Sequence, residues 1–378
     1  MRCLVGMILF LLVLLHPPSA AAAPPSKWVG AVVPLHPREE GGTALVPLAA
    51  PSKEHPLGTV AVFGQNVSDV EGDESGLVLM AYAWDLAEQR VIAAKPIARL
   101  SSYRSVVSAV RDGDRILLVA GGHFQDEWNP TNVVLFTIDQ ALQIVSREDL
   151  GVGQTPSLAI SDRWIVAGFF ERRTTDVVPA GTRSMGMSLA LHAVVLDRAT
   201  HAVVDARVFQ GTRLLYPAFD ARLSTHAFAI RDEHVYLSLP GEAEATIVQA
   251  KLPSLKPLRT RVLDGFQVAV GCSPVYVVGG SVVAVTPLGW RVMTPELELS
   301  PRTFPGAGGV MAWNARRAVL FTTSARGKGL PWRTLDSDGD CEQMIWAWDQ
   351  PVGLCGAHER VREDDDEPAT PNRVVRLR

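Results

Sequence analysis

Short apolar runs separated by polar turns recur along this chain. The clearest copy occupies residues 108–119, where an apolar stretch, a turn containing Asp112 and Gly113, and a second apolar stretch follow one another. Weaker copies occupy residues 158–167 and 228–238, and looser ones begin at residues 268 and 310. Apolar segments of this length, bounded by turn residues, are typical of β-hairpins. Each copy therefore predicts two antiparallel strands.

A second pattern marks the end of every third predicted strand. An apolar segment there is closed by an acidic or proline-containing turn, and the marks end at residues 85, 139, 197, 253, 295 and 349. The shortest step is 42 residues, from 253 to 295, and the longest is 58 residues, from 139 to 197. Four short strands repeated at such a period are typical of β-propeller blades.

The physical reason for such a repeat is that a small four-stranded sheet leaves both its faces and its edges exposed. Packing several sheets radially buries the faces of each one. This explains continuous apolar runs such as residues 116–120, where strict alternation is absent. Paired glycines at 279 and 280 predict the sharpest hairpin, over residues 275–285.

We therefore predict an all-β fold, a β-propeller of six blades with four short antiparallel strands each, and seven blades as the alternative. Residues 28–35 and 374–377 are left over in the count of six, and would pair to close the ring. The Trp-Asp pairs at 84–85 and 348–349 resemble the closing dipeptide of WD40 repeats. Through the recurrence of strands over most of the mature chain, and without a regular Gly-His or closing Trp-Asp signature, the chain resembles secreted bacterial propellers of the broad WD40-like and quinoprotein-like superfamily. This resemblance implies a fold and no particular activity, because propellers serve binding, lyase, hydrolase and redox functions.

The first residues predict a signal peptide. Arg2 is followed by an apolar run over residues 4–15, which is too short to cross a bilayer, and by small residues at 20–23. We expect residues 1–22 to be removed and the mature protein to be exported to the periplasm or beyond the cell. The alternative is a buried N-terminal strand or helix. Later apolar runs are all interrupted by Gly, Pro or charge, so no membrane span is expected after signal removal.

Composition favours one domain over residues 23–378. The chain has 378 residues, of which 47% are apolar, enough for a large core. Its formal charge of -4 provides no field that would attract nucleic acid, and we expect a monomer. The acid-rich segment at about 359–372 predicts a solvated loop.

Export changes how the cysteines are interpreted. Cys3 leaves with the signal peptide, and an oxidising compartment lets two of the remaining three pair. Cys341 and Cys355 flank a predicted hairpin turn near residues 348–351, so we expect a disulfide between them. Closing this loop of fourteen residues would stabilise the fold by about 3 kcal/mol. Cys272 would then be a small buried residue.

One acidic segment is a candidate calcium site. Asp336, Asp338 and Asp340 alternate along a short loop, as at the start of calcium-binding loops. The EF-hand pattern requires Gly at its sixth position, where this chain has Cys341. The alternative is an acidic turn between two strands. Calcium is the one cofactor that the sequence suggests.

Two loops are candidates for ligand binding. The first lies between two predicted strands and combines polar and aromatic side chains, namely His123, Gln125, Asp126, Glu127 and Trp128. Such groups serve acid-base chemistry or stack on a sugar or peptide. The second, residues 171–188, would grip an anion with Arg172, Arg173 and Arg183. The alternatives are a decorated hairpin connection and an exposed loop.

Three recurring aspartates have two interpretations. Asp112, Asp162 and Asp232 would form a set of carboxylates, or each would hydrogen-bond the backbone of its own turn. We predict the second role. The sequence contains no GxSxG, HExxH or P-loop motif.

The predicted function is that of a non-catalytic exported propeller which binds a protein, peptide or glycan. The alternatives are an extracellular hydrolase or lyase with its site at the channel mouth, and a structural envelope protein. Carboxylates, His or Arg from three or more blades converging on the channel would favour the enzyme. An apolar or Gly-lined channel with the aromatic loops on one face would favour binding.

Overall fold

The computed structural model contains only β-strands as regular elements among the residues that it describes. These residues are 43–65, 78–99, 105–122, 131–175, 186–214, 225–240, 244–264, 273–278, 280–286, 289–304, 310–313, 318–321, 333–335, 340–348, 350–356 and 373–376. In parts of some strands only the backbone is described. The predicted signal peptide, residues 28–35 and the acidic segment 359–372 lie outside this part of the chain. The all-β prediction is confirmed for the part described.

The first half of the chain forms two antiparallel sheets. The first sheet contains β1 (Ala44–Ala49), β2 (Thr59–Gln65), β3 (Leu79–Asp85) and β4 (Arg90–Ala98) in that order. The second contains β5 (Ser105–Asp112), β6 (Arg115–Gly122), β7 (Thr131–Ile138), β8 (Ile144–Ile160), β9 (Trp164–Thr175), β10 (Gly186–Asp197) and β11 (Val203–Leu214). The first half of β8 pairs with β7 and the second half pairs with β9. The second sheet is therefore two four-stranded units that share one long strand.

The second half of the chain continues with shorter sheets. Two of them have four strands: β12 (Phe228–Arg231), β13 (His234–Leu239), β14 (Glu244–Lys251) and β15 (Lys256–Asp264), then β16 (Val275–Val278), β17 (Ser281–Thr286), β18 (Gly289–Met293) and β19 (Leu299–Phe304). Two have three strands as described: β20 (Val310–Trp313), β21 (Ala318–Phe321) and β22 (Arg333–Leu335), then β23 (Asp340–Ala347), β24 (Gln350–Gly356) and β25 (Arg373–Arg376). Among the described strands, β21 and β22 pair in parallel over three residues, and β6 and β8 share one parallel bridge between Gly122 and Gln154.

The predicted hairpins are confirmed where the structure describes them. The organising repeat at 108–119 lies in the β5–β6 hairpin, and its copies lie in β8–β9 and β12–β13. The hairpin over 275–285 is β16–β17, in which Val278 pairs with Ser281. Gly280 has φ 86°, the left-handed conformation that glycine adopts without steric cost.

The third-strand marks are confirmed for five groups and wrong for the last. Five marks close β3, β7, β10, β14 and β18, each of which is the third strand of its unit. The sixth closes β23, which is instead the first strand of its sheet. The sheet of β20, β21 and β22 carries no mark. The predicted count of six blades therefore included β23 as a third strand, although β23 is the first strand of its sheet.

A capping side chain explains the three marks that end in aspartate after β3, β7 and β10. Asp85 Oδ1 accepts hydrogen bonds from the backbone N–H groups of Ala87 at 2.7 Å and Glu88 at 2.8 Å. Asp139 and Asp197 cap the equivalent turns after β7 and β10 in the same way. A short polar side chain thus satisfies donors that the turn would otherwise leave unpaired.

The three other aspartates do not have the predicted turn-capping role among the described hydrogen bonds. Asp112 Oδ1 accepts hydrogen bonds from Nε of Arg198 at 2.8 Å and from Nη2 at 2.5 Å. Arg198 Nη1 also donates to the carbonyl of Ser161. Asp112 therefore joins the turn of one unit to that of the next. Asp162 is fully exposed, and Asp232 supports its turn through its backbone, with φ 53°.

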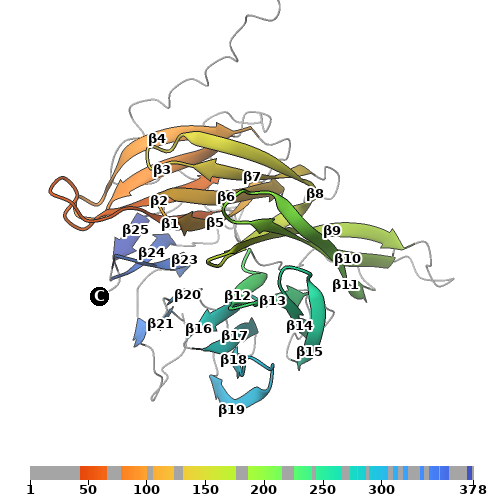
Figure 1. Cartoon of the computed structure of the whole chain (residues 1–378). Helices are drawn as coiled ribbons and strands as arrows, with labels where there is room; N and C mark the ends of the chain where they lie inside the picture. Colours follow the sequence, from red (N-terminus) through yellow and green to blue (C-terminus); the bar gives the residue numbers. More distant parts are fainter. Residues whose placement is uncertain are drawn as a thin grey trace, which may run out of the picture.

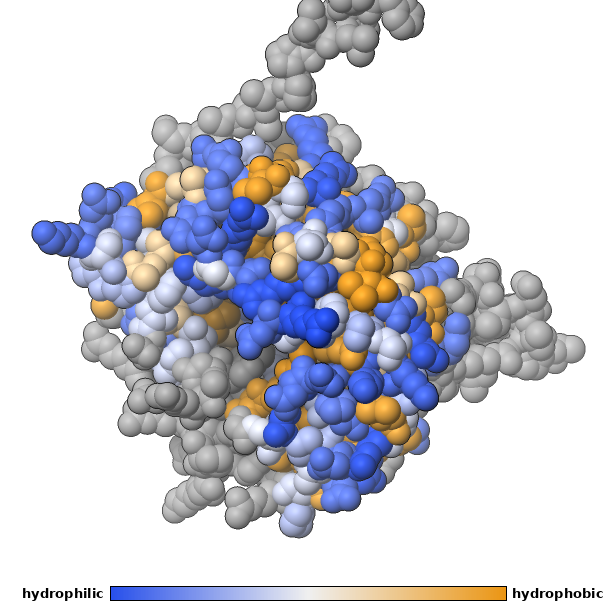
Figure 2. All heavy atoms as spheres, in the orientation of Figure 1, coloured by the Kyte–Doolittle hydropathy of each residue, from blue (hydrophilic) through white to orange (hydrophobic). Residues whose placement is uncertain are grey.

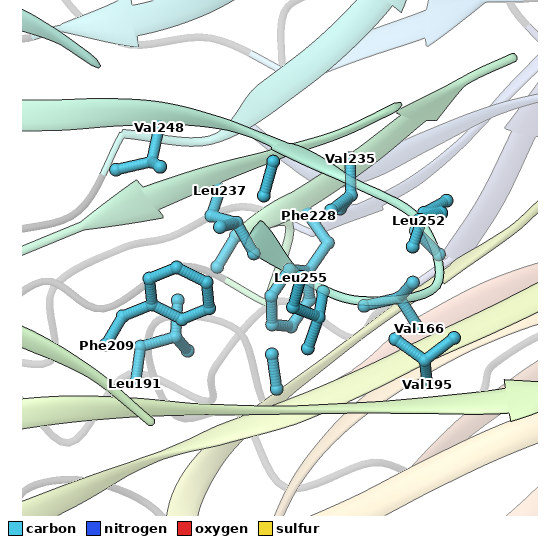
Figure 3. Packing of buried hydrophobic residues seen from close by; sticks show 14 of the residues in the cluster. Val166, Leu191, Val195, Phe209, Phe228, Val235, Leu237, Val248, Leu252 and Leu255 are labelled. Atoms are coloured by element: carbon cyan, nitrogen blue, oxygen red, sulfur yellow. The ribbon is translucent and has the colours of Figure 1, made fainter. Parts of the chain in front are cut away.

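Neighbouring sheets pack face to face through apolar side chains. Figure 3 shows one such interface, where Phe228 and Leu237 lie against Val166, Leu191 and Val195. Both faces of inner strands such as β6 are buried, as the continuous apolar runs predicted.

Gly168 allows the closest approach within this interface. A Cβ at this position would lie 2.5 Å from Cζ of Phe228 and 2.1 Å from the carbonyl oxygen of His192. The ring of Phe228 therefore rests directly on the backbone of β9.

The sheets are arranged radially. In Figure 1 the first strand of each sheet lies toward the middle of the molecule, and strands such as β11, β15 and β19 lie outside. First strands of separate sheets contact one another: Gln343 of β23 donates to the carbonyl of Thr43 and accepts from the N–H of Leu45. Antiparallel meanders around a common centre are the arrangement of a β-propeller.

Candidate functional site in the central cavity

A cavity of about 350 Å³ lies where the first strands meet. Its walls come from β1, β5, β8, β12, β16 and β23, together with the two residues 225 and 226 before β12. The apolar part of the wall consists of Ala44, Leu45, Val46, Pro47, Ala109, Val110, Leu158, Ala159, Ile160, Phe228, Ala229, Ile230, Val275, Val277, Met344, Ile345 and Trp346. Residues from at least five sheets thus surround one largely apolar space of the size that holds a small ligand.

The cavity has two distinct ends. The first strands begin at one end, which we call the loop end. They finish at the other, which we call the turn end, because β5, β8, β12, β16 and β23 are followed there by tight turns. Gln343 contacts Thr43 and Leu45 at the loop end, whereas Arg111 contacts Pro47 and Leu48 near the last residues of β1. The first strands therefore run in the same direction.

Most polar groups in the wall bind the protein itself. Ser108 Oγ donates to the carbonyl of Thr225 at 3.1 Å. The amide of Gln343 joins β23 to β1 through both its nitrogen and its oxygen. Because these groups satisfy backbone partners, they hold neighbouring sheets together at the cavity wall.

Arg111 is the cation of the cavity wall. Its Nη1 donates to the carbonyls of Leu48 at 2.6 Å and Pro47 at 3.2 Å, and its Nε donates to the carbonyl of Gly113 at 2.7 Å. Its guanidinium carbon lies 4.7 Å from the centre of the Trp348 ring. Burial lowers the pKa of Arg111, and the nearby charge of Asp114 opposes that change.

His226 lies in the wall near the loop end. The His226 side chain is half-buried, because part of it borders the cavity. The protein around the cavity nevertheless shields the ring from bulk water. This desolvation lowers the pKa of His226 to about 4. Its ring lies 5.5 Å from that of Tyr276, centre to centre, and burial raises the pKa of the Tyr276 phenol. At neutral pH this histidine is uncharged and a weak base.

The first sequence-predicted loop is not described. His123, Gln125, Asp126, Glu127 and Trp128 lie outside the described residues. The strand residues on either side of them, Gly122 and Thr131, lie at the loop end, because Gly122 pairs with Ser105 at the start of β5. The loop therefore begins and ends at this end of its sheet.

The second sequence-predicted loop is described in part. Arg183 lies outside the described residues. Arg172 and Arg173 are part of β9, where only their backbone is described. Among the described strands, the part of β9 beyond Phe170 pairs with β10 and not with β8, so these two positions lie on a hairpin that extends past β8 (Figure 1).

A hydrogen bond between two side chains lies at the base of this hairpin. His192 Nε2 is 2.6 Å from Glu171 Oε2, and its ring stacks on Phe169 at 4.8 Å. Sequence reasoning did not find this contact, which joins β9 to β10.

The predicted calcium loop is not tested by the structure. Asp336 and Asp338 lie outside the described residues, and Asp340 begins β23. In the part of the chain that the structure describes, no three His, Cys, Asp or Glu side chains are grouped as a metal site would require. That part also contains no helix with the length and hydropathy needed to cross a bilayer.

The backbone places the two predicted disulfide partners opposite each other. Cys341 of β23 and Cys355 of β24 are Cα partners in the antiparallel register. The turn between these strands contains Trp348 with φ 47°, close to where the sequence predicted it. Directly opposite Cα atoms in antiparallel strands are about 4.5–5.5 Å apart, within the range that a disulfide spans.

Sequence reasoning missed the residues that line the cavity. Arg111 lies inside the organising repeat, where it precedes the turn residue Asp112 as Arg231 precedes Asp232. The two arginines differ in surroundings: Arg111 lines the cavity, whereas Nη1 of Arg231 donates to the carbonyl of Gly280. The signal in the sequence that could have indicated the cavity was the charged residue Arg111 at the end of an apolar first strand.

No protein-family model and no curated protein matches the sequence. Among solved structures, the acylaminoacyl peptidase of Pyrococcus horikoshii is 12% identical with a TM-score of 0.44, over 87% of this chain and 51% of the peptidase. The Fusarium graminearum GH93 α-L-arabinofuranosidase complexed with arabinobiose is 11% identical with a TM-score of 0.40, over 67% and 71% of the two chains. The Dos1 propeller is 9% identical with a TM-score of 0.42, over 89% and 93%. The chain spans about half the length of the peptidase.

Proposed function

We propose that this protein is an exported, non-catalytic β-propeller that binds a ligand at its central cavity. One observation carries the proposal: the wall is largely apolar, and among its described residues no carboxylate is present. The titratable groups of that wall are Arg111 and His226, and the latter is a weak base. Acid-base hydrolysis needs a positioned acid and base, which these two groups do not supply.

A cavity suits this function better than the outer surface does. Figure 2 shows polar side chains over most of one face, with apolar side chains in separate patches. The large exposed apolar side chains of the described residues lie mainly on outer strands: Ile144, Val145, Val152, Val203, Val204, Val208, Leu258, Val262 and Leu299. Scattered apolar residues are normal on a protein surface, whereas an apolar cavity is a usual ligand site.

The proposed propeller is a single domain over residues 23–378 with seven blades. Seven groups of strands support this number: β1–β4, β5–β8, β8–β11, β12–β15, β16–β19, β20–β22 and β23–β25. Closure of the ring between the last group and the first is supported by the hydrogen bonds of Gln343 with Thr43 and Leu45. The ligand enters at one end of the ring.

Filling the cavity tests the function. The neutral fluorescent probe N-phenylnaphthylamine is expected to bind the wild-type protein at one saturable site. Ala109→Trp places an indole in the wall of β5, and we expect probe affinity to fall about tenfold or more, since a preformed pocket is lost. Fluorescence titration measures both affinities.

The matched control is Ala206→Trp on the outer strand β11. Ala206 is exposed and lies outside the cavity wall, so this variant should bind the probe as the wild type does. Equal affinity of wild type and Ala109→Trp would refute binding in the cavity. Turnover of a chromogenic glycoside or peptide by the wild type would favour the alternative, a hydrolase.

Export and the disulfide form a linked proposal. We expect the purified extracellular or periplasmic protein to lack residues 1–22 and to carry a disulfide between Cys341 and Cys355. Intact-mass measurement before and after reduction checks both, because reduction of one disulfide adds two hydrogens. A full-length cytoplasmic chain, or a free thiol at both positions in the exported protein, would contradict it. Cys355→Ser is the matched variant, in which reduction should leave the mass unchanged.

A further inference from the structure

The guanidinium of Arg111 is held rigidly at the turn end of the cavity. Three backbone carbonyls accept from its Nε and Nη1, and the ring of Trp348 covers it. A planar cation fixed in this way keeps the direction of its remaining N–H groups. Within the described part of the chain, its Nη2 has no hydrogen-bond acceptor.

The charge of Arg111 also lacks a carboxylate partner among the described residues. Arg198, which likewise joins two units, forms an ion pair with Asp112, its Nη2 lying 2.5 Å from Oδ1. Nε of Arg231 likewise lies 3.4 Å from Oδ2 of Asp232. Asp114 affects the pKa of Arg111 from the adjacent turn, but no ion pair between them is present. Arg111 therefore brings to an apolar cavity a positive charge that has no ion-pair partner among the described residues.

Apolar side chains from three units, at the ends of β5, β8 and β12, line the same end of the cavity as this cation. Val110, Ile160 and Ile230 occupy equivalent positions in the organising repeat, and all three line the cavity. Each is half-buried, because one side faces the cavity. A ligand that fits here needs a negative group at Arg111 and an apolar body beside these residues.

We propose that the cavity binds a small amphipathic carboxylate, with its carboxylate on Nη2 of Arg111 and its apolar body against Val110, Ile160 and Ile230. The inference rests on the proposed binding function and specifies its ligand. One cation balances one negative charge, which favours a carboxylate over a doubly charged phosphate. A charge-assisted hydrogen bond is worth roughly twice a neutral one.

Displacement of N-phenylnaphthylamine by decanoate, decanol and decylamine tests this assignment. On the wild type, decanoate should bind about tenfold or more tightly than decanol, and decylamine most weakly. Arg111→Gln should remove the preference for decanoate and leave decanol binding within about twofold. Arg231→Gln is the matched control, since Arg231 lies outside the wall, and it should keep the preference.

The outcomes separate the inference from the function. Equal binding of decanoate and decanol by the wild type overturns the inference while the binding function stands. Persistence of the preference in a folded Arg111→Gln variant overturns it as well. If that variant does not fold, the order of the three ligands on the wild type decides. Absence of probe binding by the wild type contradicts the proposed function itself.

Discussion

Replacing Phe228 with alanine is expected to lower the free energy of unfolding by about 3–5 kcal/mol. Phe228 is 4% exposed and fills the space between the unit that ends with β11 and the sheet that begins with β12. Its ring rests on the backbone of β9 at Gly168, which has no side chain that could fill the space left by the ring. The variant loses both the transfer free energy of the ring and the contacts around the space that it leaves.

Urea denaturation of both proteins measures this loss. Leu258→Ala is the control, because Leu258 is 47% exposed on the outer strand β15, and it should change the free energy by no more than about 0.5 kcal/mol. A loss below about 1 kcal/mol for Phe228→Ala would mean that the two sheets do not depend on this contact. An unchanged slope against urea would show that both variants unfold from the same compact state.

Local patterns were enough to predict the hairpins. In β12–β13 the apolar run, the turn residue Asp232 and the next apolar run are adjacent in sequence, and the turn needs no distant partner. The third-strand marks succeeded for the same reason, since Asp85 caps a turn only two and three residues further on.

The position of a strand within its sheet was harder to predict. First and third strands both end in tight turns, so β23, which ends at Trp346 and Ala347, looked like another third strand. Its true neighbours are β24 in its own sheet and β1 of the adjacent sheet, and the contact between Gln343 and Leu45 spans 298 residues. Only nonlocal pairing distinguishes the two cases.

The long strand β8 shows the same limit of local patterns. Its first half is mostly exposed and its second half is buried, because the first half is an outer strand of one unit and the second half an inner strand of the next. The register shifts between Gln154 and Ser157, where Thr155 has φ 46°. The sequence alone does not predict that one strand continues through this irregularity and pairs with β7 before it and with β9 after it.

The candidate site was predicted in a different place from the cavity. Polar loops drew attention to His123 and Arg183 because binding residues are frequent on loops. The cavity instead collects ordinary strand residues from sheets far apart in sequence, such as Arg111 and His226. Linear spacing carries no signal for such a set, apart from the charge of Arg111 inside an apolar repeat.

Replacing Asp85 with alanine is the second large expected effect, a loss of about 3 kcal/mol in the free energy of unfolding at neutral pH. The side chain of Asp85 is 1% exposed, and its Oδ2 lies 2.5 Å from Nδ1 of His55. Its Oδ1 accepts from the backbone N–H groups of Ala87 and Glu88. Alanine would leave all three donors without this acceptor. Thermal and urea denaturation measure the loss.

The effect of Asp85 should depend on pH. Burial raises the pKa of this carboxyl. Hydrogen bonds from the backbone of Glu88, from His55 and from the backbone of Ala87 together lower the pKa by more than burial raises it, so the net pKa lies below its ordinary value. The stabilisation is complete above that ordinary value of about 3.9 and is lost as the pH falls through the lower folded value. The free-energy difference between wild type and Asp85→Asn should therefore shrink below about pH 4.

Asp139 provides the matched comparison for this argument. Its carboxylate accepts from the N–H groups of Ala141 and Gln143 in the equivalent turn after β7, but these hydrogen bonds are exposed, and none of the described histidines is bonded to it. Asp139→Ala should therefore cost only about 1 kcal/mol. Equal losses at Asp85 and Asp139 would assign the whole effect to turn capping. A larger, pH-dependent loss at Asp85 would assign the excess to the buried contact with His55, which fastens the segment between β1 and β2 to the end of β3.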